Sequence, residues 1–203
     1  MIDPATSPVP RVDLTLTLGG TSFDLRWRAL VAAVVPAPRF GREGEVLAGV
    51  RTARDAGADL ADVSLSPRLI GPAAGAGLVP VVVRARSIPE AAAARRAGAG
   101  LVLVPADVVA DVAVADVAVA DGPVAVVIDD VGHLERARAV AERHGVALAI
   151  DVTARVSAGA MALESAAVAG GCRVVCTADV RRTRRVVETV AALLAARREV
   201  PER

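Results

Sequence analysis

The sequence predicts an α/β protein: a minimal or incomplete TIM (β/α) barrel of seven to eight parallel strands with an N-terminal β-hairpin. Runs that are apolar on both faces alternate with helical stretches, the pattern of parallel strands covered by helices. Seven strand–helix units can be counted. The 203 residues fall short of the ~250 that a barrel of eight units usually needs, so the barrel must be small or incomplete.

The hairpin is predicted where Gly19-Gly20 joins two short runs, Val12–Leu18 and Thr21–Arg26. The first run alternates apolar and polar residues, and a two-residue glycine turn between such runs is a hairpin signal. We expect the hairpin to cover one end of the main domain. The predicted organisation is residues 1–28 for the N-terminal segment with the hairpin, 29–198 for the barrel and 199–203 for a tail.

The remaining elements follow in order. The predicted strands are Ala29–Val35, Asp59–Leu65, Pro80–Val83, Gly100–Val104, Pro123–Ile128, Val146–Asp151 and Cys172–Thr177. The predicted helices are Glu43–Ala56, Pro89–Ala97, Gly132–His144, Ala158–Ala169 and Val180–Arg198. An open doubly wound sheet is the alternative architecture, but no Gly-x-Gly-x-x-Gly follows the first strand.

Two further segments lack a clear period. Gly71–Gly77 is rich in glycine and is predicted to be a flexible connection between strands, because no Gly-Lys-Ser/Thr accompanies it. Asp111–Asp121 repeats every five residues, which fits neither helix nor strand, and is predicted to be a short helix of low sequence complexity.

The composition excludes several classes of function. The net charge is +1 and the aromatic residues are Phe23, Trp27 and Phe40, so we expect no nucleic-acid partner and no attraction to an anionic membrane. The chain has no Lys, Asn, Gln or Tyr, which excludes mechanisms that need an amine, a side-chain amide or a phenol. No secretory signal or membrane-spanning stretch is recognised, and we expect a cytoplasmic protein.

The cysteines and histidines do not form a metal site. Cys172 and Cys176 are predicted on one face of one strand, roughly 13 Å apart, beyond the reach of a disulfide. His133 and His144 lie far from them in sequence. No spacing suits a metal, and we expect no cofactor.

Charged residues gather where the predicted strands end, the edge at which such barrels bind ligands. Asp62, Arg84, Asp151 and Asp179 are the candidate ligand-binding residues. Carboxylates there can accept hydrogen bonds from a planar heterocycle or act as acid and base. They can also cap the next helix, the interpretation we favour for Asp179 and for Asp130. For Asp62 and Asp151 both interpretations stay open.

The basic run Arg181–Arg185 begins the last predicted helix. A phosphate site or an acidic partner could explain these cations, which oppose the helix dipole. A solvated helix face is the favoured interpretation, since arginine must supply all surface cations other than histidine in this chain.

Several segments, taken in order, resemble one family. They are Leu18–Leu25, Arg28–Val31, Asp55–Val63, Val79–Val83, Ala94–Leu101 and Gly171–Arg181. The chain resembles dihydropteroate synthase, the pterin-binding barrel of folate synthesis, from about Val12 to Ala196. The resemblance implies a barrel with its site at the carboxyl ends of the strands.

The departures from that family fall on its functional positions. Val35-Pro36 stands where the family has the Asn that helps to hold magnesium, and Arg84 where it has a pterin-binding Asp. Leu103-Val104 replaces an Asn-Asp pair, and Cys176 and Ala178 replace the Arg and His that hold the pyrophosphate. The family's Ser-Arg-Lys segment also has no counterpart. Because the family's Asn is missing, the comparison with the family implies that the magnesium site is lost.

Asp62, Asp151 and Asp179 match acidic positions of the family, and Asp151 could match either its sixth or its seventh strand. We therefore expect a non-catalytic relative with no catalytic residues, which binds a second copy of itself or an active synthase. Two alternatives remain: an enzyme of altered chemistry that uses Arg84 to bind an anion, and a synthase with residual activity on the pterin pyrophosphate and para-aminobenzoate.

Overall fold

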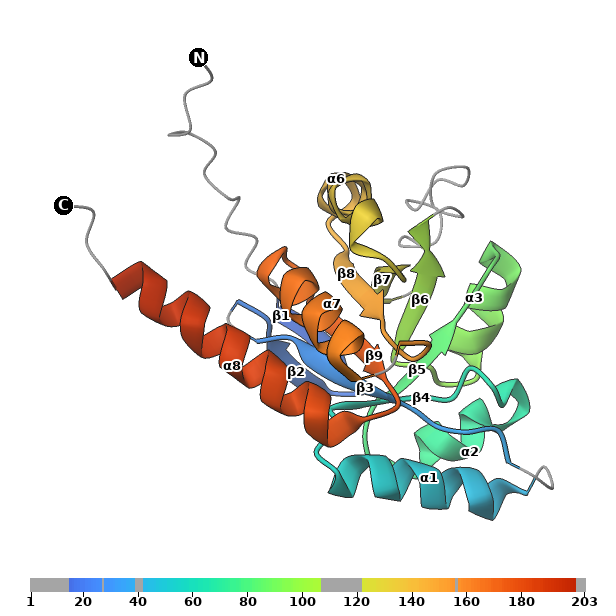
Figure 1. The fold of residues 1–203 in the computed structure, drawn as a ribbon. Coiled ribbons are helices and arrows are strands. Elements are labelled where there is room, and N and C mark those ends of the chain that lie inside the picture. Colours follow the sequence, from blue (N-terminus) through green and yellow to red (C-terminus); the bar gives the residue numbers. More distant parts are fainter. Residues whose placement is uncertain (1–14, 27, 39–41, 107–121, 156, 200–203) are drawn as a thin grey trace.

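Seven parallel strands form a closed barrel in the computed structural model, which describes residues 15–26, 28–38, 42–106, 122–155 and 157–199 (Figure 1). The barrel strands are β3 (Leu30–Val34), β4 (Leu60–Asp62), β5 (Val81–Arg84), β6 (Leu101–Pro105), β7 (Val124–Ile128), β8 (Ala147–Asp151) and β9 (Val174–Thr177). Each strand pairs with the next in the chain, and β9 pairs with β3. The predicted TIM-like barrel is confirmed, and the open sheet is excluded.

Helices surround the barrel (Figure 1). They are α1 (Glu43–Asp55), the 3-10 turn η1 (Pro67–Leu69), α2 (Ile70–Gly75), α3 (Ile88–Arg96), η2 (Val131–His133), α6 (Leu134–His144), α7 (Ser157–Ala169) and α8 (Val180–Glu199). The expectation that Gly71–Gly77 is a flexible connection is wrong over most of its length. Ile70 and Ala73 are buried one helical turn apart, so packing of this face holds a short helix despite the glycines.

Alternate residues of each strand face two separate apolar cores. Leu30 and Ala32 of β3 belong to the core inside the barrel, whereas Val31 and Ala33 belong to the core between barrel and helices. This explains why the strands read as apolar on both faces. Four positions of the inner core are alanines, because a barrel of seven strands has a narrow interior; they are Ala32, Ala125, Ala147 and Ala149.

The hairpin closes one end of the barrel. Its strands are β1 (Thr15–Leu18) and β2 (Thr21–Asp24), joined by a turn in which Gly19 and Gly20 have φ of 54° and 81°. Positive φ at both positions is the conformation that favours glycine in such turns. Leu16, Leu18 and Leu25 join the inner core, together with Leu30, Leu60 and Leu101 at the starts of three strands. The hairpin therefore seals the end where the strands begin.

The two cysteines do not share a strand face. Cys176 lies in β9 and belongs to the inner core, whereas Cys172 precedes the strand and belongs to the outer core. The predicted strand begins too early, because Gly171 adopts φ of 104° and the chain turns before Val174. Both cysteines are free and buried.

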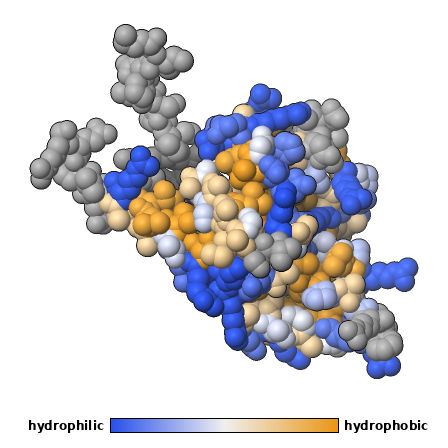
Figure 2. All heavy atoms as spheres, viewed as in Figure 1, coloured by the Kyte–Doolittle hydropathy of each residue, from blue (hydrophilic) through white to orange (hydrophobic). Residues whose placement is uncertain are grey.

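The face of the molecule seen in Figure 2 is mixed, with hydrophobic patches bordered by hydrophilic residues. No helix in the part of the chain that the structure describes is both long and apolar enough to span a bilayer. Trp27, Phe40, the repeat Asp111–Asp121 and residues 200–203 of the predicted tail lie outside the described residues.

Candidate ligand site at the barrel mouth

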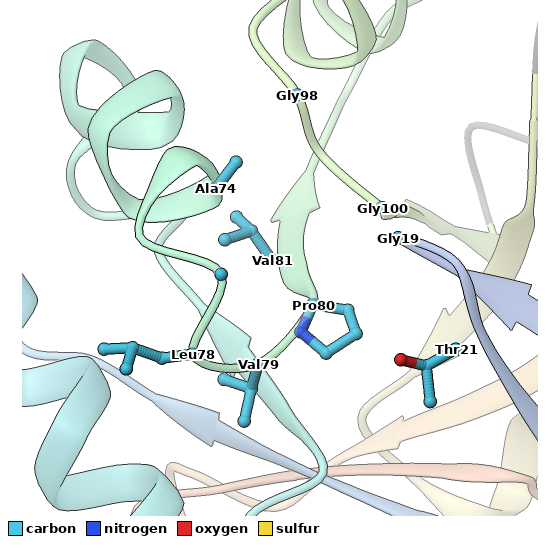
Figure 3. A pocket seen from close by; sticks show the side chains of 10 residues that line it. Gly19, Thr21, Ala74, Leu78, Val79, Pro80, Val81, Gly98 and Gly100 are labelled. Carbon is cyan, nitrogen blue, oxygen red and sulfur yellow. The ribbon is translucent and has the colours of Figure 1, made fainter.

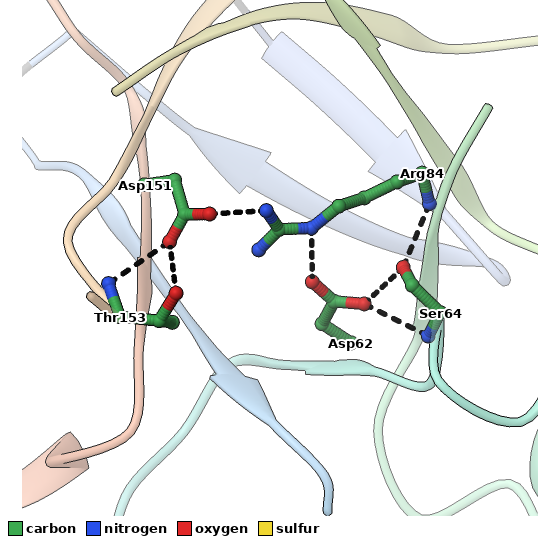
Figure 4. A network of polar contacts seen from close by, with 5 residues as sticks. All are labelled: Asp62, Ser64, Arg84, Asp151 and Thr153. Carbon is green, nitrogen blue, oxygen red and sulfur yellow. Dashed lines mark hydrogen bonds and ion pairs between the residues drawn. The ribbon is translucent and has the colours of Figure 1, made fainter. Parts of the chain in front are cut away.

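Three of the four predicted site residues meet at the mouth, the end of the barrel where the strands finish. Asp62, Arg84 and Asp151 are the last residues of β4, β5 and β8. Each lies two positions beyond a residue of the inner core, and residues two apart on a strand share a face. All three side chains therefore point toward the barrel axis, where they contact one another (Figure 4).

The guanidinium of Arg84 bridges the two carboxylates. Its Nε donates to Asp62 Oδ2 at 3.0 Å, and its Nη1 forms an ion pair with Asp151 Oδ2. The side chain of Asp62 is 1% exposed, that of Asp151 is 17% and that of Arg84 is 29%. A cation thus spans the mouth between opposite parts of its wall, partly shielded from water.

The outer oxygen of each carboxylate is held by its own loop. Asp62 Oδ1 accepts from the backbone N–H of Ser64 at 2.9 Å and from the Ser64 hydroxyl. Asp151 Oδ1 accepts from the backbone N–H of Thr153 at 2.9 Å and from its hydroxyl at 2.7 Å. Ser64 Oγ also accepts from the backbone N–H of Arg84 at 2.8 Å. All four carboxylate oxygens consequently have partners within the protein.

These contacts set the protonation states. Burial alone would raise the pKa of Asp151, but hydrogen bonds from Arg84 and Thr153 outweigh it and lower that pKa. Burial alone would lower the pKa of Arg84, but the hydrogen bond to Asp151 and the charge of Asp62 raise it. Arg84 and Asp151 are therefore charged at neutral pH.

Cys176 is the register partner of Asp151 and belongs to the inner core beside the ion-pair layer. Burial, reinforced by the negative charge of Asp62, raises the pKa of its thiol. A thiol that stays protonated is a poor nucleophile and a poor metal ligand.

The mouth does not fit the magnesium ion that is held by the family which the sequence resembles. Val35, at the position of the family's Asn, is buried and apolar and offers no side-chain oxygen. Among the described residues, no three His, Cys, Asp or Glu side chains gather in a group that could hold a metal ion. The available carboxylate oxygens bind Arg84 instead.

Asp179, the fourth predicted site residue, lies apart from this network. It is exposed, and its Oδ1 accepts from the backbone N–H of Arg182 at 3.2 Å in the first turn of α8. Asp130 caps η2 in the same way, with the N–H of Gly132 at 2.7 Å. Both geometries match the favoured capping interpretation.

The sequence prediction missed Ser64 and Thr153, which hydrogen-bond the two site aspartates. Each stands two positions after a site aspartate, in the segments Asp62-Val63-Ser64 and Asp151-Val152-Thr153. An Asp followed two residues later by Ser or Thr forms a local turn with side-chain-to-backbone hydrogen bonds. The repetition of this pattern after two strands was the signal that could have identified them.

The basic run Arg181–Arg185 is not a uniformly solvated face. Arg182 pairs with the fully buried Glu164 of α7 at 3.1 Å, and Glu164 also accepts from the Thr183 hydroxyl at 2.6 Å. Arg184 pairs with Asp59, before β4, at 2.6 Å. Arg181 and Arg185 are exposed. The solvated interpretation is thus wrong for Arg182 and Arg184, which fasten α8 to its neighbours.

A hollow of about 160 Å³ lies at the opposite end of the barrel, beside the hairpin turn (Figure 3). It is lined by Gly19 and Thr21 of the hairpin, Pro80 before β5, and Gly98 and Gly100 before β6. Its lining contains no ionisable side chain, so it offers neither acid–base chemistry nor charge recognition.

No family model matches the sequence, and no curated protein matches it. Solved structures do match it. The Yersinia pestis dihydropteroate synthase in complex with a pterine–sulfa conjugate is 15% identical, with a TM-score of 0.65 over 90% of this chain and 100% of that one. The Thermus thermophilus dihydropteroate synthase is 18% identical, with a TM-score of 0.66 over 89% and 99%. The Mycobacterium tuberculosis protein Rv1207 is 21% identical, with a TM-score of 0.61 over 92% and 99%. The chain therefore has the dihydropteroate synthase fold.

Proposed function

We propose that this chain is a non-catalytic protein on the dihydropteroate synthase fold, which acts as a binding or accessory protein. Its partner is a second copy of the chain or an active synthase. The observation that carries the proposal is the mouth, where Arg84 bridges Asp62 and Asp151. The carboxylates that would receive a ligand's donors already hold a cation from the protein itself.

Arg84 already makes hydrogen bonds that a pterin would need. A hydrogen bond to a charged group contributes about 1.5–3 kcal/mol. Two such bonds, to Asp62 and to Asp151, are already made by Arg84. A ligand with N–H donors must break both and displace the cation, and each 1.4 kcal/mol lost lowers affinity about tenfold. Pterin binding in the family's manner is therefore opposed by several powers of ten.

The chemical step lacks its groups as well. Departure of pyrophosphate needs positive charge or donors that stabilise the developing anion. Arg84 is paired with two carboxylates, the chain has no Lys, and the positions of the family's Arg and His are Cys176 and Ala178. None of these positions would therefore supply a cation to stabilise the departing pyrophosphate.

The direct test is a turnover assay with purified protein, the pterin pyrophosphate and para-aminobenzoate. We expect no pteroate above the rate without enzyme, while an active bacterial synthase in the same buffer provides the positive control. Pteroate formation that scales with protein concentration would refute the non-catalytic assignment.

The partner is tested by sedimentation of the pure chain alone and after mixing with the active synthase of the same organism. We expect either a dimer of the chain or a complex with the synthase. The accessory role is contradicted if the chain stays monomeric at all concentrations and does not bind the synthase.

A second candidate function rests on one unused donor. Within the described residues no atom accepts from Arg84 Nη2, and the Arg84 side chain is 29% exposed. This nitrogen could bind a small anion in an enzyme of altered chemistry. A thermal-shift screen of small carboxylates and phosphates tests it. A ligand that stabilises wild type and Arg84→Ala equally would show that Arg84 does not bind it.

A further inference from the structure

We infer that Asp62 and Asp151 form a receptor for a guanidinium group, and that Arg84 is its tethered occupant. A small planar guanidinium or amidinium cation would take the same place once Arg84 is removed. This inference goes beyond the proposed function, because it holds whether or not the chain catalyses a reaction.

The first observation is that each carboxylate is also held by contacts that do not involve the side chain of Arg84. The outer oxygen of each carboxylate is fixed by the backbone N–H and hydroxyl of Ser64 or of Thr153. The other two oxygens, Asp62 Oδ2 and Asp151 Oδ2, face the guanidinium of Arg84 from two sides (Figure 4). Two acceptors held by their own loops form a preorganised site.

The second observation is that the planar guanidinium group of Arg84 makes both contacts with the aspartates. Nε bonds one carboxylate and Nη1 the other, with the group lying flat between them (Figure 4). A free guanidinium presents N–H donors around the same plane, so it can satisfy the same two oxygens. A tetrahedral ammonium has no such planar arrangement, so the site should discriminate between the two shapes.

The third observation concerns charge and burial. Two aspartates and one arginine give the group a formal charge of −1, and without Arg84 the charge becomes −2. Asp62 is 1% exposed, so water cannot compensate this charge well. Once Arg84 is removed, the two carboxylates therefore favour the binding of another cation. In wild type the tether keeps Arg84 at a high local concentration, which excludes competitors.

The test is a thermal titration of Arg84→Ala with methylguanidinium chloride at millimolar concentration. We expect a saturable rise in Tm of about 3–5 °C in the variant and no saturable rise in wild type. Arg155→Ala is the matched control, because Arg155 is another mouth arginine whose partner Asp130 is half exposed. Tetramethylammonium chloride controls for cation charge and ionic strength.

The double variant Arg84→Ala/Asp151→Asn removes one acceptor and should lose the rise. Equal responses in the single variant, the double variant and wild type, or no response in Arg84→Ala, would overturn the receptor. If Arg84→Ala does not fold alone, it is refolded with each salt. If the variant refolds in methylguanidinium chloride but not in tetramethylammonium chloride, the inference is supported. If it refolds equally in both salts, or in neither, the inference is refuted. Neither result depends on the turnover assay, so the two proposals fail separately.

Discussion

The two ends of the barrel interior are closed by opposite chemistry. Where the strands begin, hairpin leucines such as Leu18 and Leu25 fill the opening with apolar side chains that are almost fully buried. Where the strands end, one arginine and two aspartates span the opening. Apolar burial stabilises the fold at about 25 cal/mol per Å², whereas a buried ion pair adds little net stability after desolvation.

The apolar end and the charged end of the barrel interior therefore have different roles: the first stabilises the fold, and the second is the candidate site. A seal built only for stability would be apolar at both ends, since replacing buried ion pairs by apolar residues is often neutral or stabilising. The charged layer is therefore the part of the interior that our proposals treat as a ligand site, and the guanidinium of Arg84 occupies it.

The largest effect is expected from Arg84→Ala. The change leaves Asp62 and Asp151 facing each other without a cation, and such unpaired buried charge costs about 3–5 kcal/mol of folding free energy. Urea unfolding at pH 7 measures it. Arg155→Ala, which breaks an exposed pair with Asp130, should cost at most about 1 kcal/mol. Equal losses in the two variants would mean that Arg84 is not paired in the mouth.

Leu18→Ala addresses the other end of the barrel. Leu18 is 1% exposed and lies in the inner core, so its truncation should cost about 2–4 kcal/mol through lost burial and a cavity. Leu193→Ala on α8 is the control, because Leu193 is 65% exposed; it should change stability by no more than about 0.5 kcal/mol. The loss at Leu18 should be the same at pH 7 and in acid below the ordinary aspartate pKa of about 3.9, where the loss at Asp151 becomes smaller. A pH-dependent loss at Leu18 would contradict an apolar seal.

Asp151→Asn tests the pH dependence of the mouth. Because the pKa of Asp151 is lowered in the folded protein, the folded state binds fewer protons than the unfolded chain as pH falls. The stabilisation is complete above the ordinary aspartate pKa of about 3.9 and is lost as pH falls through the lowered value. Asp151→Asn should therefore cost about 1–3 kcal/mol at pH 7 and progressively less in acid. Urea unfolding along a pH series checks this; a constant cost would contradict the ion pair.

The smallest effect concerns the thiols. Burial raises the pKa of Cys172 to about 12 and also raises that of Cys176, so neither should react with a thiol reagent before unfolding. In Arg84→Ala, Cys176 should become the first to react because it lies beside the opened mouth, while Cys172 stays protected in the outer core. If Cys172 reacted first, the outer core and not the mouth would be the part of the variant that opens first.

The sequence predicted the barrel because its signals are local. Each buried strand is a short apolar run followed by a helix, and the turn at Gly19-Gly20 marks the hairpin. The positions of Asp62, Arg84 and Asp151 at strand ends were local signals too. Misplaced boundaries, as at Cys172, arose where a positive-φ glycine breaks an apolar run before the strand begins.

The partners of the charged residues could not be predicted, because they depend on closure of the barrel. Only the alternative of an enzyme with altered chemistry gave Arg84 a partner, a bound anion, whereas the structure pairs it with Asp151, which is 67 residues away in sequence. Arg184 pairs with Asp59 across 125 residues. Such contacts require knowledge of which strands become neighbours or face each other across the interior, which periodicity along the chain does not contain.

The measurement that tests the central claim most directly is NMR of arginine side chains in the ¹⁵N-labelled protein, with the Arg84 signal assigned from its absence in Arg84→Lys. If Arg84 bridges the two aspartates, its Nε–H should exchange slowly with water and should shift in both Asp62→Asn and Asp151→Asn. An Arg84 Nε–H that exchanges as fast as that of the exposed Arg181, and that ignores both substitutions, would contradict a mouth occupied by its own guanidinium.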